Sequence, residues 1–491
     1  MKTLLNLISL KFIASLLGLV YSIIQVRYFG ASRTIEVYFA AQTLVYLITS
    51  LTQGGKLAEI FLPEYHRLEE KQKGLGFKAL NIVINRLLVF GTIIIIVVFI
   101  FTPVFMKLII PGFSPEEQRQ AVQIFRVLLP YLFIQIVNSF YITILNAEEK
   151  FGRAEFLGMV NIIINISILV LLYHSLGVWA LVISLLLGKF VEFFFYYFQL
   201  KKIGYTYQSI WQLPHFNHVS FFKAMQATFL YVGATQIYSV VLTASISYLP
   251  EGTYAIFKYV QNLANKIKGL FIQPFITIFF TRYSKLVQKS KSVVQEFKKY
   301  LTGIISVNNI VLIGSILMGD YIIEIIWGSK KFDESDVQLA YIFLLFNILG
   351  IIFSSVGSIY RKMAVSHHKG KQLYFYWSFA QLLSALFAYI LINIFKVYGL
   401  YFIIPINSFL MAIVSFIVYK KTDTSLPFKF IDKENLIFIL LTLLAFLIKF
   451  SYTIDKTIPI IKEEKIIIFV TITLILISYP TTVVYKLFKN E

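Results

Sequence analysis

The sequence contains no cysteine and few charged residues, and both absences limit what the protein can be. Without cysteine the chain forms no disulfide and no thiolate metal site. Only 14% of its 491 residues are Asp, Glu, Lys or Arg, whereas 58% are hydrophobic. A soluble chain of this length carries far more charge. The composition therefore argues against a soluble enzyme and favours a membrane protein.

The motifs of nucleotide-driven motors and of common hydrolases are also missing. No GxxxxGK[ST] phosphate loop is present, and the short GGK at 54–56 does not replace one. The six histidines lie in predicted loops or at helix ends and lack the spacing of metal ligands. We therefore expect no enzyme activity, no metal and no cofactor.

What the sequence does contain is a series of long apolar runs. Each run of about 20 residues is long enough to cross a bilayer core of about 30 Å. The sequence thus predicts an all-α polytopic membrane protein with about 14 transmembrane helices. Their expected ranges are 4–26, 36–62, 80–110, 121–146, 155–175, 178–200, 218–248, 254–281, 301–327, 336–360, 372–395, 397–419, 434–454 and 465–486.

Lysine and arginine gather in alternate loops between these runs. The richest are RYSKLVQKSKSVVQEFKK after the eighth expected helix and RKMAVSHHKGK after the tenth. Because positive residues mark cytoplasmic loops, we predict that both termini are cytoplasmic. The same bias accounts for the net charge of +20 without a nucleic-acid partner. The loops are too short to hold a folded extramembrane domain.

Two stretches of the chain resemble each other. LIIPGFSPEEQRQAVQIFRVLLPYLF is similar to EIIWGSKKFDESDVQLAYIFLLFNILG, which pairs Gly112 with Gly328, and a later match pairs Gly177 with Gly399. We predict two parallel six-helix repeats plus two C-terminal helices. The corresponding boundaries are 1–205 for an N-lobe, 206–425 for a C-lobe and 426–491 for the appended pair. Such repeats are typical of carriers that open to alternate sides of the membrane.

The expected helix 254–281 has one polar face. Seven residues fall within an arc of about 160°: Lys258, Gln261, Asn262, Asn265, Lys266, Lys268 and Gln273. A lysine that faces lipid at mid-membrane costs about 2.5–3.5 kcal/mol, so this face must meet protein or water. We predict that it lines a hydrated cavity and binds an anionic or hydroxylated cargo. The alternatives, a purely topological charge or bonding to neighbouring helices, stay open.

Further candidate cargo-binding residues come from the first two expected helices. Lys11 and Ser15 lie on one face of the first helix, Arg27 follows its end, and Glu36 opens the second. Lys56 closes TQGGK at 52–56, where paired glycines predict a bend.

Other charged residues in the expected spans have a structural explanation. Lys189 and Glu192 have the i,i+3 spacing of a neutralising pair, which favours a structural role. Charged residues near helix ends can reach the interface, and we expect this of Arg86, Arg126, Lys223, Asp320, Glu324 and Lys449.

Several segments resemble the MurJ/MviN family of lipid II flippases in the MATE-like MOP superfamily. They are YFGASRTIEVYFAAQ (28–42), FLPEY (61–65), IIPGF (109–113), ILNAEEKFGRAEFLGMVNI (144–162) and GLFIQPFITIFFTRYSKL (269–286). The resemblance implies outward flipping of a polyprenyl-diphosphate-linked sugar, with lipid II as the first candidate and peptidoglycan synthesis as the process. It also implies the bacterial inner membrane, a groove for the lipid tail beside helices thirteen and fourteen, and a monomer with possible cell-wall assembly partners.

The chain departs from this family at its cationic positions. Where the family usually has arginines in helices one, two and eight, this sequence has Ser15 and Tyr21, Thr49 and Ser50, and Gln261 and Asn262. A flippase for O-antigen, capsule or exopolysaccharide precursors is therefore the close alternative. A MATE-type drug exporter and a membrane-embedded glycosyltransferase are more distant ones. Expected helices seven and eleven contain no acidic residue, which argues against the sodium site of some relatives.

Overall fold

The computed structural model describes residues 2–51, 54–148, 150–214, 216, 226–288, 294–367, 369–421, 433–454 and 462–488, and most of these residues are in helices. Within these ranges no β-strand occurs, and the one β-bridge joins Ser329 to Phe332. The predicted all-α class is confirmed.

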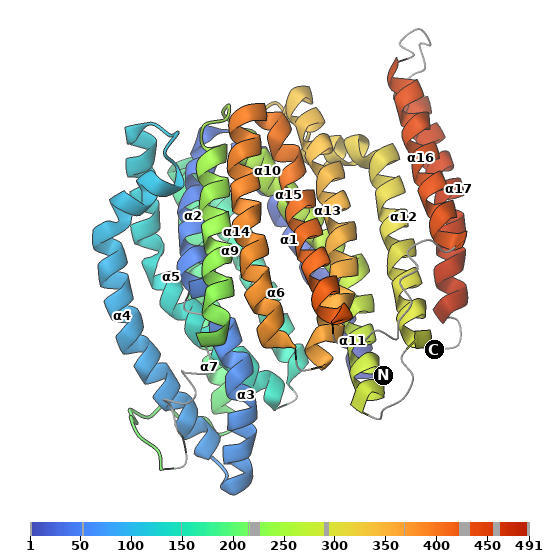
Figure 1. Ribbon diagram of the computed structural model, residues 1–491. Helices are drawn as coiled ribbons and strands as arrows, with labels where there is room; N and C mark the ends of the chain where they lie inside the picture. The colour runs from blue at the N-terminus through green and yellow to red at the C-terminus, as the bar shows by residue number, and fades with distance from the viewer. Residues whose placement is uncertain are drawn as a thin grey trace. The chain divides into compact units, whose positions relative to one another are not determined.

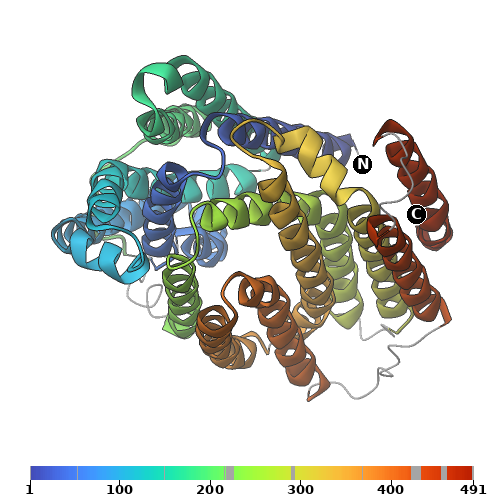
Figure 2. The same cartoon turned by 90° about the horizontal axis from the view of Figure 1, so that it is seen from above.

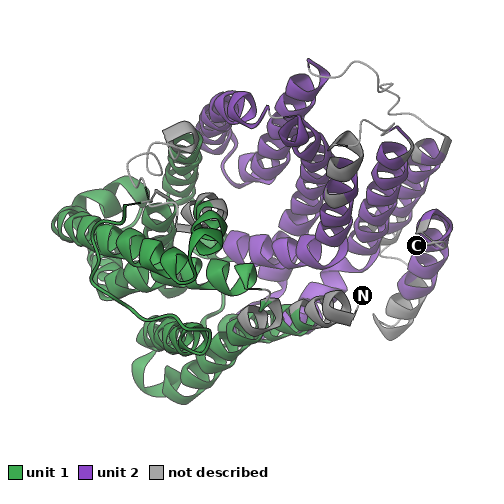
Figure 3. Ribbon diagram, turned by 90° about the horizontal axis from the view of Figure 1, so that it is seen from below, with its two compact units in different colours: residues 1–255 green, residues 256–491 purple. Residues whose placement is uncertain are grey.

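The chain divides by its packing into unit 1, residues 1–255, and unit 2, residues 256–491 (Figure 3). The helices of unit 1 are α1 (Lys2–Phe29), α2 (Arg33–Leu51), α3 (Gly54–Lys71), α4 (Leu75–Ile109), α5 (Pro115–Ala147), α6 (Phe151–Leu176), α7 (Val178–Lys201) and α9 (Gln226–Ile246). Helix α5 is central to this unit, since it packs against α2, α3, α4, α6 and α7. Helix α10 (Thr253–Ile267) begins in unit 1 and continues into unit 2.

Unit 2 is built around α13. Its elements after α10 are the π-helix η1 (Lys268–Ile272), α11 (Gln273–Gln288), α12 (Val294–Trp327), α13 (Glu334–Ser366), α14 (Gly370–Phe395), α15 (Val397–Lys420), α16 (Lys433–Ile454) and α17 (Lys462–Phe488). Helix α13 packs against α11, α12, α14 and α15. The last two helices, α16 and α17, pack beside α12 (Figures 1 and 2).

Each of the fourteen expected spans corresponds to one helix or to consecutive helical elements. By length and composition, ten of the described helices can cross a membrane: α1, α4, α5, α6, α7, α12, α13, α14, α15 and α17. The other four spans correspond to α2 with α3, to α9, to α10 with η1 and α11, and to α16. Many large apolar side chains on these helices are exposed, as expected for faces that meet lipid.

The internal repeat is visible in the helix boundaries. Helix α5 starts at 115 and ends at 147, and α13 starts at 334 and ends at 366, so the two helices are equally long and are offset equally at both ends. The same offset relates both ends of α6 to those of α14, and both ends of α7 to those of α15. Two copies of one helical pattern therefore follow each other along the chain, and this constant offset defines the repeat register.

The predicted pairs Gly112–Gly328 and Gly177–Gly399 are wrong, because each differs from the repeat register by three positions. The capping boxes that start α5 and α13 are built on Ser114 and Asp333, which are equivalent in the repeat register. The residue equivalent to Gly177 is Lys396, because both separate consecutive helices with the same backbone torsions. The first match shifted the register because the loop between Gly328 and α13 is three residues longer than the loop between Gly112 and α5.

The second helix of the second repeat is interrupted by a π-helix. In the first repeat α2 ends at Leu51 and α3 begins at Gly54. The predicted bend at TQGGK includes residues 52 and 53, which are outside the described residues, so it stays a prediction. In the second repeat the π-helix η1 separates α10 from α11, and α11 begins at Gln273. Gly54 and Gln273, where α3 and α11 begin, are equivalent in the repeat register. The sequence did not predict the π-helix.

Helices α12, α16 and α17 share an apolar cluster with a buried lysine beside it. Lys449 of α16 donates from Nζ to Asp320 Oδ2 at 2.7 Å and to the Leu317 carbonyl at 3.2 Å. Its ammonium also lies 4.6 Å from the ring centroid of Phe469 and 4.9 Å from that of Tyr321. With 9% of its surface exposed, Lys449 does not extend to the interface as we expected. It instead ties α16 to α12.

The segment after α7 is held against α4 by asparagine side chains. Asn81 donates to the Thr206 carbonyl and accepts from the Tyr205 hydroxyl. Asn85 donates to the Ile210 carbonyl at 2.9 Å and accepts from the Tyr207 hydroxyl at 2.6 Å. The first part of the connection between the two predicted lobes is therefore fixed to unit 1.

Candidate functional site

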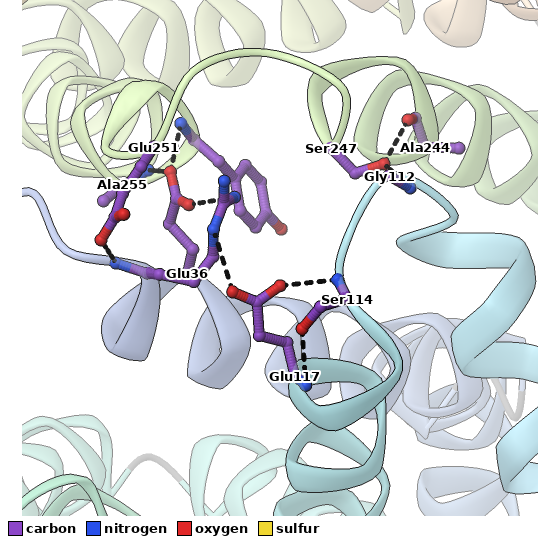
Figure 4. Close-up of polar contacts among 10 residues, drawn as sticks. Glu36, Gly112, Ser114, Glu117, Ala244, Ser247, Glu251 and Ala255 are labelled. Atoms are coloured by element: carbon purple, nitrogen blue, oxygen red, sulfur yellow. Dashed lines mark hydrogen bonds and ion pairs between the residues drawn. The ribbon is translucent and has the colours of Figure 1, made fainter.

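Glu36 is a buried carboxylate at the start of α2 that binds the start of α10. Its Oε1 accepts hydrogen bonds from the backbone N–H of Tyr254 at 2.9 Å and of Ala255 at 3.3 Å. Its side chain is fully buried. The free N–H groups of a helix N-terminus and the helix dipole both favour a carboxylate there. In the repeat register Ala255 is the equivalent of Glu36, so the contact joins equivalent points of the two copies (Figure 4).

Arg33 balances the charge of Glu36 and extends the contact. Its Nη1 donates to Glu36 Oε2 at 2.6 Å, and its Nε lies 3.5 Å from Glu117 Oε1. Its backbone N–H donates to Glu251 Oε1 at 2.6 Å. The guanidinium also lies 4.4 Å from the ring centroid of Phe113. One arginine thus connects the start of α2, the start of α5 and the turn before α10.

A third loop joins the same cluster through glycine. The Gly112 N–H donates to Ser247 Oγ at 2.9 Å (Figure 4). A Cβ at Gly112 would lie 2.4 Å from the Ser247 carbonyl oxygen, so only glycine permits this approach. Nearby, Thr43 Oγ1 lies 2.9 Å from the Tyr254 hydroxyl oxygen. The loops before α2, before α5 and before α10 meet in this cluster. With both termini cytoplasmic, the predicted topology places all three on the outer side of the membrane.

The polar helix of unit 2 has the two faces that its sequence predicts. Asn262 and Asn265 are exposed, and Lys258, Gln261, Lys266 and Lys268 are partly buried. On the opposite face Tyr259, Val260 and Ala264 are buried. The helix therefore packs one side into the unit and leaves the amide-rich side open. Its role in binding cargo stays a prediction.

The π-helix η1 interrupts this polar face at Lys268. A wider turn rotates the helix that follows it relative to a continuous α-helix, so the predicted arc ends there and Gln273 belongs to a new helix. Lys268 Nζ donates to Ser354 Oγ of α13 at 2.8 Å. Turns of this kind often mark functional sites in helices.

The remaining predicted residues are spread over α1 and α3. Ser15 is partly buried, and Arg27 is exposed in the last turn of α1. Lys11 and Lys56 lie in α1 and α3, but their side chains are outside the described residues. The structure does not join these four residues to Glu36 through any described contact.

The predicted pair Lys189 and Glu192 is present in α7. Lys189 Nζ lies 2.7 Å from Glu192 Oε2, and the same carboxylate accepts hydrogen bonds from Asn161 and from the Tyr196 hydroxyl. A buried carboxylate with three donors is well compensated. The arrangement supports the structural role that we expected.

Sequence reasoning missed Arg33, Glu117, Glu251 and Ser247 as partners in the Glu36 cluster. One signal was available, because SPEE at 114–117 has the pattern of a capping box and places Glu117 at a helix start. Arg33 offered a second signal, because it precedes Glu36 by three residues, the spacing of an ion pair on a helix. Glu251 and Ser247 lie more than 130 positions from their partners Arg33 and Gly112, and no local pattern reveals such contacts.

Comparisons with known proteins agree on one family. The sequence model described as "Lipid II flippase MurJ" matches residues 25–481. A probable lipid II flippase MurJ of Borreliella burgdorferi is 21% identical over 448 residues, which covers 89% of this chain and 86% of the relative. Another, from Buchnera aphidicola subsp. Baizongia pistaciae, is 22% identical over 370 residues, which covers 72% and 70%.

Solved structures show the same fold. A structure of lipid II flippase MurJ in an inward closed conformation has a TM-score of 0.77 at 21% identity and covers 98% of this chain and 99% of that chain. An inward-facing MATE multidrug transporter of the MOP superfamily has a TM-score of 0.66 at 17% identity and covers 85% and 97%.

Proposed function

The chain is a multi-pass membrane protein that belongs to the MurJ family of lipid II flippases, and from this membership we propose that it flips lipid II. The proposed cargo is a polyprenyl-diphosphate-linked sugar precursor of peptidoglycan, which moves from the inner to the outer leaflet of the bacterial cytoplasmic membrane. Both termini are cytoplasmic in this proposal. The protein acts as a carrier and has no catalytic step.

The observation that supports the proposal is the π-helix η1, which interrupts the polar helix of the second repeat. Interrupted helices often line the binding region of transporters, and π-helices are frequent at functional sites. Here the interruption follows α10, which exposes Asn262 and Asn265 and carries Lys258, and Lys268 opens the π-helix. Amides suit sugar hydroxyl groups, and lysines suit a diphosphate. In unit 1, Lys11, Ser15, Arg27 and Lys56 stay proposed cargo-binding residues.

We assign Glu36 to the closure of the outer side. The predicted lobe boundaries place α2 in the N-lobe and α10 in the C-lobe, so the contact of Glu36 with Tyr254 and Ala255 joins the lobes. If the lobes rock to open outward, this contact has to break. Its charge-assisted hydrogen bonds thus favour the state that is closed on that side.

Lipid binding tests the proposal. The full chain is purified with its native lipids, and lipid II is compared with other polyprenyl-diphosphate glycans by native mass spectrometry. The test variant is Lys258→Gln/Lys268→Gln. The matched control is Lys330→Gln/Lys371→Gln, which removes the same charge from two exposed positions of unit 2.

We expect selective retention of lipid II by the wild type and the control, with at least a tenfold loss in the test variant. Retention of another glycan in place of lipid II would make the protein a surface-polysaccharide flippase. If none of these lipids binds to a correctly folded protein, the flippase function is refuted.

A further inference from the structure

Two cationic side chains lie close together inside unit 2, next to the π-helix. Lys268 opens η1, and its Nζ donates to Ser354 Oγ of α13. Arg361 follows Ser354 by seven residues on the same helix, which places both on one face two turns apart. The charge of Arg361 also acts electrostatically on the ammonium of Lys268.

Neither cation is matched by a carboxylate in the described part of unit 2. The ion pairs found there are Arg282 with Glu296 and Lys449 with Asp320. The Nε of Arg361 is buried and has no hydrogen-bond partner among the described residues. Two partly buried like charges repel each other, and each has lost part of its hydration.

The surroundings of the two cations are polar on one side and aromatic on the other. Ser354 and Ser358 share the α13 face with Arg361, and both hydroxyls are already anchored to carbonyls of their own helix. The guanidinium of Arg361 lies 5.6 Å from the ring centroid of Trp377. The guanidinium thus lies near the Trp377 ring, while its buried Nε–H donates to no described residue.

We propose that Lys268, Arg361, Ser354 and Ser358 form a binding site for a phosphate group. An arginine fork and a lysine point charge together match the geometry and charge of phosphate oxygens. A bound phosphate removes the repulsion between the two cations and supplies an acceptor for the unpaired Nε–H. The phosphate comes either from the lipid-linked cargo, which rests on the proposed function, or from an anionic membrane lipid.

The sequence analysis did not predict this site, because the expected helix ranges leave Arg361 outside the membrane helices. The expected tenth span ended at residue 360, and the following RKMAVSHHKGK was interpreted as a cytoplasmic loop. In the structure α13 continues to Ser366, so Arg361 belongs to the helix. The added turns bring its side chain to the same face as Ser354.

Thermal unfolding in lipid nanodiscs tests the proposal with inorganic pyrophosphate as the probe. The full chain is compared with Arg361→Gln, Arg361→Lys, Lys268→Gln and the control Lys371→Gln, an exposed lysine of α14. In zwitterionic nanodiscs we expect pyrophosphate to raise the Tm of the wild type and of the control. The apparent affinity should fall at least tenfold in Arg361→Gln and Lys268→Gln, and less in Arg361→Lys.

The unfolding of the ligand-free protein separates binding from a structural role. Without pyrophosphate, Arg361→Gln should unfold at the same temperature as the wild type or higher, because one of two repelling charges is gone. A lower Tm for Arg361→Gln together with an unchanged pyrophosphate response would overturn the proposal. A response that is equal in the wild type and all variants would overturn it as well.

A second set of nanodiscs with phosphatidylglycerol identifies the source of the phosphate. If this lipid stabilises the wild type, but not Arg361→Gln, and abolishes the pyrophosphate response, the occupant is a membrane lipid. An undiminished pyrophosphate response supports the diphosphate of the cargo. Loss of lipid II retention while the pyrophosphate site persists would refute the proposed function alone.

Discussion

Gly177 and Lys396 adopt the same backbone conformation at equivalent points of the two repeats. Gly177 has φ 54° and ψ −126°, and Lys396 has φ 54° and ψ −128°. Each residue ends one helix and begins the next, and the offset between the two is the one that relates α5 to α13. Lys396 is the one non-glycine residue with positive φ in the described chain. The second repeat therefore places a lysine in a backbone conformation that favours glycine.

Lys396→Gly should stabilise the protein. A side chain in this region of φ and ψ costs about 1–3 kcal/mol, whereas glycine loses about 0.5–1 kcal/mol through the greater freedom of the unfolded chain. We expect a net gain of about 1 kcal/mol, measured as a higher Tm in detergent. Lys396→Ala is the control, since it removes the charge but keeps the strained Cβ. A gain of the same size in both variants would show that the charge is responsible.

Glu36→Ala should loosen the start of α10. The carboxylate holds the amides of Tyr254 and Ala255, and hydrogen bonds to a charged group contribute about 1.5–3 kcal/mol. Amide hydrogen exchange in a peptide that covers these residues should accelerate about tenfold or more. Glu116→Ala removes an exposed carboxylate nearby and should change nothing. Equal exchange in both variants would refute the closing role of Glu36.

Asp320→Ala should destabilise the attachment of α16 and α17. The change leaves the buried ammonium of Lys449 without its carboxylate, and breaking such a pair costs about 3–5 kcal/mol. We expect the low end of this range, because Asp320 is 31% exposed. Adding Lys449→Met should recover part of the loss, since the uncompensated charge is then absent. If the double variant is less stable than Asp320→Ala, the charge pair is not the reason.

Asn85→Ala should release the segment that follows α7. It removes the bonds to the Ile210 carbonyl and the Tyr207 hydroxyl, whose loss costs about 1–3 kcal/mol. Trypsin should then cleave several-fold faster after the exposed Lys201 and Lys202, because backbone that opens is cut more readily. Asn393→Ala is the control, since Asn393 is exposed and bonds within its own helix. Cleavage that is unchanged in Asn85→Ala would show that the segment is held by other contacts.

The sequence by itself determined the class of the protein and the number of its spans. Apolar length decides whether a segment can cross a bilayer, and this is a local property of each run. The same holds for the two faces of α10, where polar Asn262 and Asn265 alternate with buried Tyr259 and Val260 at helical spacing.

Only the tertiary structure decided which charges meet and where the repeats align. Glu36 binds amides more than 200 positions away, and Lys449 is buried against Asp320 rather than extended to the interface. The choice of a π-turn at Lys268 and the extension of α13 through Arg361 depend on packing against neighbouring helices. No local sequence pattern predicts these contacts and helix bounds, because each depends on the free energy of contacts between distant segments.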